Sequence, residues 1–113
     1  MSLSTDKVND LIEGKWDELA LYHLTPAQAD SLLTHKGVII QEGWLPAHYK
    51  FPEHAHAEAQ LLLVTRGVLT HKTATASFLQ KTNDLLVVPA KKRHTAIIGD
   101  EDLEFFVIVK GNG

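Results

Sequence analysis

The chain has 113 residues, 44% of them hydrophobic and 22% charged, with a formal net charge of −3 at pH 7, which is typical of one globular domain and excludes a disordered or repetitive chain. Lys and Arg residues form no basic stripe, so we expect no nucleic-acid partner. The sequence contains no cysteine and no apolar stretch that resembles a secretory signal or a membrane span, so we expect a cytoplasmic protein without disulfides and without a membrane partner.

The first predicted element is a short helix near the N-terminus. Ser4 or Thr5 can cap this helix, and Gly14 can end it. Apolar residues at helical spacing lie on one side of it: Val8, Leu11 and Ile12. We expect the helix to be peripheral.

A strand and a helical turn follow. Residues Glu18–Leu24 predict a strand at the edge of a sheet. Next, Thr25 offers an N-cap, Pro26 suits the first helical position, and Gln28 is the capping-box partner of Thr25. We therefore interpret residues 1–36 as an N-terminal extension with a short helix and an edge strand.

From Gly37 onward the chain is a series of short β-rich runs separated by turn residues, a spacing that indicates a sandwich or a barrel. The runs are Val38–Gln41, Gln60–Thr65, Val68–Thr73, Leu85–Val88, Thr95–Ile98 and Leu103–Val109. Three segments within them are apolar on both faces: Leu61–Val64, Leu85–Val88 and Phe105–Val109. Their outer faces need a cover, which a homodimer would supply.

Two of the seven histidines form an HxH pair in the stretch FPEHAHAEAQ. In an extended chain, residues two apart point to the same face, so His54 and His56 can reach one ion from a single strand edge. Gln60 keeps this parity, and Glu58 shares it unless a turn interrupts the Ala-rich stretch. Because cysteine is absent, any metal must bind through imidazole, carboxylate or amide groups.

Two longer sequence patterns add further residues to the histidine pair. In the first, HxH is followed by three residues, a potential ligand, six residues and a glycine, and the positions are His54, His56, Gln60 and Gly67. In the second, a proline precedes a histidine by five residues, in the stretch PAKKRH: Pro89 and His94. Together, over roughly Trp44 to Val109, they resemble the two motifs of the cupin superfamily, and in particular its small single-domain members with an HxHxxxQ variant.

This resemblance implies the fold and the cofactor. It implies an all-β, double-stranded β-helix or jelly-roll barrel over residues 37–113, preceded by the short N-terminal helical element. It also implies one divalent transition metal inside the barrel, with Fe, Mn, Ni, Cu and Zn all compatible with the ligands. The implied ligands are His54, His56, Gln60 and His94.

The chain departs from the family pattern at several positions. His48, Asn83 and Lys91 stand where the motifs usually have glycine, and Ile98 stands where the second motif ends in asparagine. Asn tolerates a left-handed backbone better than most residues do. If the position of Lys91 needs a positive φ, this lysine costs stability there or the loop is built differently.

Gln60 replaces the usual glutamate, which leaves three neutral imidazoles and one neutral amide as ligands. A metal on this set keeps its full charge, so we expect weaker metal affinity and a preference for anionic molecules such as carboxylates or sugar acids. Similar HxHxxxQ cupins include uronate-processing proteins of pectin breakdown, in which the glutamine is a metal ligand. The substitution therefore does not by itself abolish the site.

Each candidate site residue also has an interpretation in which it has no role in metal or ligand binding. The His54–His56 pair can be two solvated loop histidines, Gln60 a barrel-facing residue that bonds a ligand or water, and His94 a satisfied core histidine. The run Lys91–Arg93 is either a solvated turn or a contact for a carboxylate substrate, and Asp100–Asp102 resembles a solvated hairpin turn. Five further residues can line the cavity mouth, although each is more often packing or surface: Trp44, His48, Tyr49, Glu58 and His71.

Three functions remain open from the sequence. The first is a metal-dependent enzyme, an isomerase, lyase or dioxygenase, with Glu58 or Tyr49 as a catalytic proton-transfer group. The second is a non-catalytic module that binds or senses a small ligand. The third is a metal-free structural barrel, because Gln60 and Lys91 depart from the family pattern.

Overall fold

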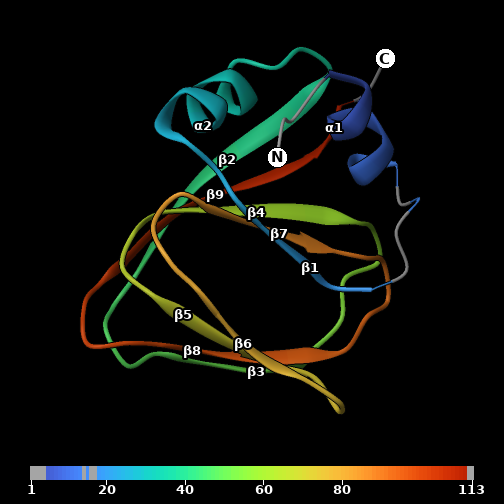
Figure 1. Ribbon diagram of the computed structural model, residues 1–113. Coiled ribbons are helices and arrows are strands. Elements are labelled where there is room, and N and C mark those ends of the chain that lie inside the picture. The colour runs from blue at the N-terminus through green and yellow to red at the C-terminus, as the bar shows by residue number, and fades with distance from the viewer. Residues whose placement is uncertain (1–4, 14, 16–17, 112–113) are drawn as a thin grey trace.

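A computed structural model describes residues 5–13, 15 and 18–111, and it consists of two antiparallel sheets that close into a jelly-roll barrel (Figure 1). The elements are α1 (Thr5–Ile12), β1 (Ala20–His23), α2 (Pro26–Leu33), β2 (Val38–Leu45), β3 (Lys50–His54), β4 (Gln60–Arg66), β5 (Leu69–Lys72), β6 (Ser77–Gln80), β7 (Asp84–Val88), β8 (His94–Ile98) and β9 (Leu103–Lys110). The predicted fold class is confirmed.

One sheet has the strand order β1-β7-β4-β9-β2 and the other has the order β3-β8-β5-β6. All six runs predicted after Gly37 are strands, and the strand predicted over Glu18–Leu24 is the shorter β1. The sequence did not predict β3 or β6. The capping candidate Ser4 and the predicted helix stop Gly14 lie outside the described residues.

The five-stranded sheet is apolar on both faces because each face has its own core. Inside the barrel, buried side chains of both sheets pack together: Val64, Leu69, Ala96, Ile98 and Leu103. On the outside, the sheet packs against α1 and α2 through a second buried set: Val8, Leu11, Ile12, Leu24, Ala29, Leu32, Leu61, Leu63, Leu85, Val87 and Ile108. Figure 1 shows both helices over this outer face.

This arrangement corrects two expectations. The helix α1 is not merely peripheral, because Leu11 is only 1% exposed and belongs to the outer core. The outer faces of β4, β7 and β9 are covered by the chain's own helices, so they do not require a second copy as a cover. None of the helices in the described part of the chain is long and apolar enough to cross a membrane.

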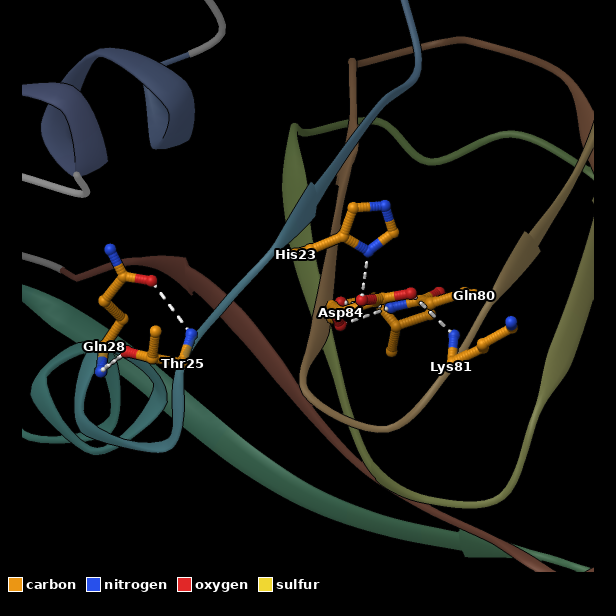
Figure 2. Close-up of polar contacts among 7 residues, drawn as sticks. His23, Thr25, Gln28, Gln80, Lys81 and Asp84 are labelled. Atoms are coloured by element: carbon orange, nitrogen blue, oxygen red, sulfur yellow. Dashed lines mark hydrogen bonds and ion pairs between the residues drawn. The ribbon is translucent and has the colours of Figure 1, made fainter. Parts of the chain in front are cut away.

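Polar contacts hold the N-terminal segment on the barrel (Figure 2). The predicted capping box is present: the Gln28 backbone N–H donates to Thr25 Oγ1 at 3.1 Å, and the Thr25 backbone N–H donates to Gln28 Oε1 at 2.9 Å. Strand β1 pairs with β7, where His23 Nδ1 lies 2.6 Å from Oδ1 of the buried Asp84. The other carboxylate oxygen of Asp84 accepts from the Lys81 N–H at 2.9 Å.

Candidate functional site

Three histidines predicted as ligands lie close together in the structure. The potential ligand nitrogens of His54, His56 and His94 all lie within 4.8 Å of one another. The ring centroids are 4.8 Å apart for His54 and His56, 4.4 Å for His54 and His94, and 5.5 Å for His56 and His94. The histidines of the two cupin-like motifs are therefore close together in space.

A β-bulge in β3 directs His54 into the barrel. Phe51 pairs with Ala96 and His54 pairs with His94, so two residues of β3 oppose one residue of β8 between these pairs. The extra residue reverses the usual alternation, and both Phe51 and His54 line the same cavity. Pro52 is tolerated here because β3 is an edge strand and the bulge needs no ladder donor.

The loop before β8 is attached to the segment that carries the histidine pair. The Lys91 N–H donates to the His56 carbonyl at 2.6 Å. His94 is the first residue of β8 and pairs directly with His54 across the sheet. His56 lies beyond the end of β3, so the expectation that one strand edge carries both histidines of the pair is wrong.

Backbone carbonyls fix the tautomers of two of these rings. His54 Nδ1 donates to the Pro52 carbonyl at 2.7 Å, and His94 Nδ1 donates to the Lys92 carbonyl at 3.1 Å. In the neutral imidazole this leaves Nε2 unprotonated, as a metal ligand must be. Burial, followed by the nearby His54 and His94, lowers the pKa of His56. Burial also lowers the pKa of His94, although the hydrogen bond to Lys92 opposes this shift.

The cluster opens into a cavity of about 110 Å³ between the two sheets, and Gln60 lines it together with the three histidines. The remaining lining residues are Phe51, Leu62, Leu69, His71, Leu86, Val88, Ala96, Leu103, Phe105 and Val107. No Asp, Glu, Lys or Arg is among these described lining residues. The cavity is therefore mostly apolar, and its polar lining groups are neutral nitrogen and oxygen donors.

The donor set fits a transition metal. Two nitrogens bound to one ion at about 2.1 Å each are at most about 4.2 Å apart, so a small inward movement of the rings suffices. Lone pairs on Nε2 of His54 and His94 are available, and Gln60, whose side-chain amide offers an oxygen ligand, lines the same cavity. Three imidazoles with one oxygen ligand suit Fe, Mn, Ni, Cu or Zn in the divalent state.

The two catalytic candidates from the sequence lie elsewhere. Glu58 is exposed in the bend between β3 and β4, so the turn that would break its parity is present. Tyr49 is 41% exposed and its ring packs edge-on against Phe51, 5.1 Å between centroids. Neither residue lines the cavity.

Other residues considered for the cavity mouth form surface contacts. Trp44 is 57% exposed on β2, and His48 lies 3.5 Å from Asp100. Lys92 pairs with Glu18 at 2.9 Å and Arg93 pairs with Glu53 at 2.7 Å, so two of the three cations of the run already have carboxylate partners on the protein. This favours the solvated-turn interpretation of the run over carboxylate recognition.

His71 was among the residues considered for the cavity mouth, but its pairing with Gln80 was not predicted. His71, on β5, is 2% exposed and lines the cavity, and its Nε2 lies 2.8 Å from Oε1 of the fully buried Gln80 on β6. His71 has the same strand parity as the buried Leu69, so its side chain points to the inner face of β5. Gln80 could not be found this way, because β6 itself was not predicted.

Solved structures support the fold. A DUF861 family protein from Thermotoga maritima shares 16% identity over 79% of this chain and 97% of its own, with a TM-score of 0.60. An RmlC-like cupin family protein with a double-stranded β-helix fold from Methanocaldococcus jannaschii shares 25% identity over 66% of this chain and 70% of its own, with a TM-score of 0.55. The DMSP lyase DddQ from Ruegeria pomeroyi shares 16% identity over 67% of this chain and 39% of its own, with a TM-score of 0.60.

The barrel, its histidine cluster and these similar structures define the protein as a cupin. None of the curated proteins compared with the chain matches it significantly. The pattern of the family of AraC-like ligand-binding domains matches residues 36–109, and the chain belongs to this family. The matched segment includes all four predicted metal ligands.

Proposed function

We propose that the protein binds a small carboxylate-containing molecule on a divalent transition metal held by His54, His56, Gln60 and His94. A metal in this position supplies a Lewis acid that attracts and polarises an oxygen of the ligand. The side chains of the protein hold the ion at one end of the cavity and surround the rest of the ligand with apolar surface.

The observation that carries this proposal is the neutrality of the cavity. Four uncharged donors face it, and no charged side chain is among its described lining residues. A divalent ion on these donors retains its full charge in an apolar environment, where Coulomb interactions are strong. An anionic ligand compensates this charge, whereas a neutral ligand does not.

Two further observations support ligand binding. The cavity of about 110 Å³ is small compared with the ~300–1,000 Å³ of pockets for drug-sized ligands, so it suits a molecule of a few carbon atoms. The family to which the chain belongs is described as a ligand-binding domain.

Catalysis by the bound metal is the second candidate function. Four protein ligands leave open positions on an octahedral ion, which is the arrangement that metal-dependent isomerases, lyases and dioxygenases need. Turnover of keto acids or uronates faster than by the free metal would support catalysis over binding alone. Tight, reversible binding of the same compounds without turnover would support the binding module.

The first experiment is elemental analysis of protein purified without added metal and without a nickel column. We expect about one equivalent of a transition metal per chain in the wild type and its loss in His56→Ala. His35→Ala is the matched control, because His35 is only partly buried and bonds Asn9 at 3.2 Å, away from the cluster. Absence of metal from the wild type, even after reconstitution with Fe, Mn, Ni and Zn, would refute the proposal and favour a metal-free barrel.

We also propose that the protein is a homodimer whose interface includes β2. This strand is at the edge of its sheet, and it carries Ile39 and Trp44, which are 44% and 57% exposed. Open strand edges with apolar side chains favour pairing with another chain. Sedimentation velocity should give the mass of a dimer for the wild type and of a monomer for Trp44→Lys, and a monomeric wild type would contradict the proposal.

A further inference from the structure

The pair His71 and Gln80 forms a rigid hydrogen-bonded unit in the cavity wall. Gln80 Nε2 donates to the Leu62 carbonyl at 2.7 Å and to the Asp84 carbonyl at 2.9 Å. These two bonds use both amide hydrogens, so the amide orientation is fixed and Oε1 must face His71. Figure 2 shows Gln80 beside Asp84 at this position.

The orientation of Gln80 determines the tautomer of His71. Because Oε1 can only accept, His71 Nε2 must carry a hydrogen and donate it across the 2.8 Å contact. In the neutral ring, Nδ1 then carries a lone pair and can only accept a hydrogen bond. Stacking on Phe78, with centroids 5.4 Å apart, holds the ring in this orientation.

His71 Nδ1 is buried and has no hydrogen-bond partner among the residues that the structure describes. An unsatisfied buried acceptor is costly, so such groups are usually paired with another group or have a functional role. His71 lines the cavity, and its ring centroid is 6.4 Å from that of the proposed metal ligand His94. A molecule bound at the histidine cluster therefore lies near the ring that carries this unpaired acceptor.

We propose that His71 is a specificity-determining residue, and that its Nδ1 accepts a hydrogen bond from a hydroxyl group of the bound carboxylate, so that the ligand is a small hydroxy acid. This inference rests on the proposed function and names the ligand class of the same site. The carboxylate balances the charge of the metal, and the hydroxyl group supplies the donor that His71 requires.

The test compares lactate with propionate, which differ by one hydroxyl group, by calorimetry on the zinc-loaded protein. We expect the wild type to prefer one lactate enantiomer over propionate by a ratio about fivefold larger than the ratio in His71→Phe. The affinity for propionate should change less than twofold between the two proteins. Chelation of zinc by the hydroxyl group contributes equally to both, so the change in ratio reports the hydrogen bond to His71.

His35→Ala is the control, because His35 bonds Asn9 at 3.2 Å, away from the cavity, and its truncation should leave the ratio unchanged. Nitrogen NMR of the labelled wild-type protein is a second measurement that needs no variant. The unprotonated Nδ1 signal of His71 should move on addition of lactate and stay in place on addition of propionate.

The outcomes separate the two proposals. If neither acid binds the zinc-loaded protein, the proposed function fails, and the role of His71 fails with it. If both acids bind, the lactate preference is the same in wild type and His71→Phe, and the Nδ1 signal does not respond, then the role of His71 alone is overturned.

Discussion

Lys91 has a left-handed backbone conformation, with a φ of 62°, in the loop between β7 and β8. For a residue with a Cβ atom this conformation costs about 1–2 kcal/mol. The loop tolerates the cost because the Lys91 N–H donates to the His56 carbonyl, which joins the two segments that carry the histidine cluster. The strain therefore lies next to the candidate metal site.

Replacing Lys91 with glycine should stabilise the protein. We expect Lys91→Gly to raise the free energy of unfolding by about 0.5–1 kcal/mol, because the relief of strain exceeds the added entropy of the unfolded chain. Urea denaturation measures this change. Lys91→Ala removes the same side chain but keeps Cβ, and a similar gain in that variant would show that strain is not the cause.

The three residues that replace family glycines all have positive φ: 67° for His48, 69° for Asn83 and 62° for Lys91. The family pattern therefore predicted the left-handed backbone of these turns correctly. The residue types found here would not have predicted it, because none of the three is glycine. From the sequence alone, Lys91 allowed either a strained loop or a rebuilt one. The hydrogen bond to His56 decides between them, and it depends on tertiary contacts that a local pattern does not contain.

The buried imidazole of His71 should make stability depend on pH. Burial lowers the pKa of His71 to about 4 from 6.5, more strongly than its hydrogen bond to Gln80 raises it, and nearby His94 lowers it slightly further. The folded state thus binds fewer protons than the unfolded state between these two values. Stability is fully present above pH 6.5 and falls as the pH decreases toward 4, by about 3 kcal/mol at most for this residue.

Urea denaturation of metal-free protein at pH 7 and pH 4.5 tests this dependence. His56 and His94 also have lowered pKa values and contribute in the same direction, so the informative quantity is the difference between wild type and His71→Phe. The variant should lose less stability between the two pH values than the wild type does. An equal loss in both proteins would mean that His71 is protonated similarly in the folded and unfolded states.

At the scale of elements, the bulge in β3 shows why the site was only partly predictable. The HxH spacing identified His54 and His56, but simple alternation placed both on one strand edge. In the structure, the extra residue in the Pro52–Glu53 segment turns the side chain of His54 into the barrel. His56 lies in the loop after the end of β3. The position of such a bulge depends on pairing with β8, which lies about forty residues further along the chain.

The same reason explains the strands that the sequence did not predict. In β3, Pro52 argues against a strand, and it is accommodated because the strand is at an edge and bulged. In β6, four residues pair with β5, and this pairing rather than local propensity defines them as a strand. The contact between His71 and Gln80 depends on this pairing, so it could not be predicted from the sequence.

The turn between β4 and β5 requires glycine at position 67. Gly67 has a φ of 91°, and a Cβ atom there would lie 2.7 Å from the Asp102 carbonyl oxygen. Gly67→Ala should therefore lower the free energy of unfolding by about 2 kcal/mol or more, from backbone strain and from the clash. Gly99→Ala is the control, because its nearest contact would be an ordinary 3.6 Å, and chemical denaturation should show a change below about 0.5 kcal/mol.

At the scale of the whole molecule, the two faces of one sheet have different roles. Leu62, Leu86 and Val107 face the cavity, whereas Leu61, Leu63 and Leu85 face the helices. The sequence correctly indicated strands that are apolar on both faces, but it assigned their cover to a second copy of the chain. The short α1 and α2 gave too weak a periodic signal to identify them as the outer layer of the core.

Because the outer core and the cavity lie on opposite faces of the sheet, a packing defect in the outer core should leave metal binding in the cavity intact. Leu11, on α1, is 1% exposed, and Leu11→Ala should lower the free energy of unfolding by about 2–4 kcal/mol. The folded fraction should still bind metal with the stoichiometry of the wild type, since α1 contributes no residue to the cavity wall.

Glu13→Ala is the control for this variant. Glu13 is exposed, and its ion pairs with Lys15 and Lys110 are 3.9 and 4.0 Å long, so its removal should cost less than about 1 kcal/mol. Thermal unfolding with metal analysis at 25 °C measures both quantities on the same samples. Loss of metal from folded Leu11→Ala would show that the helices also determine the geometry of the histidine cluster through the shared sheet.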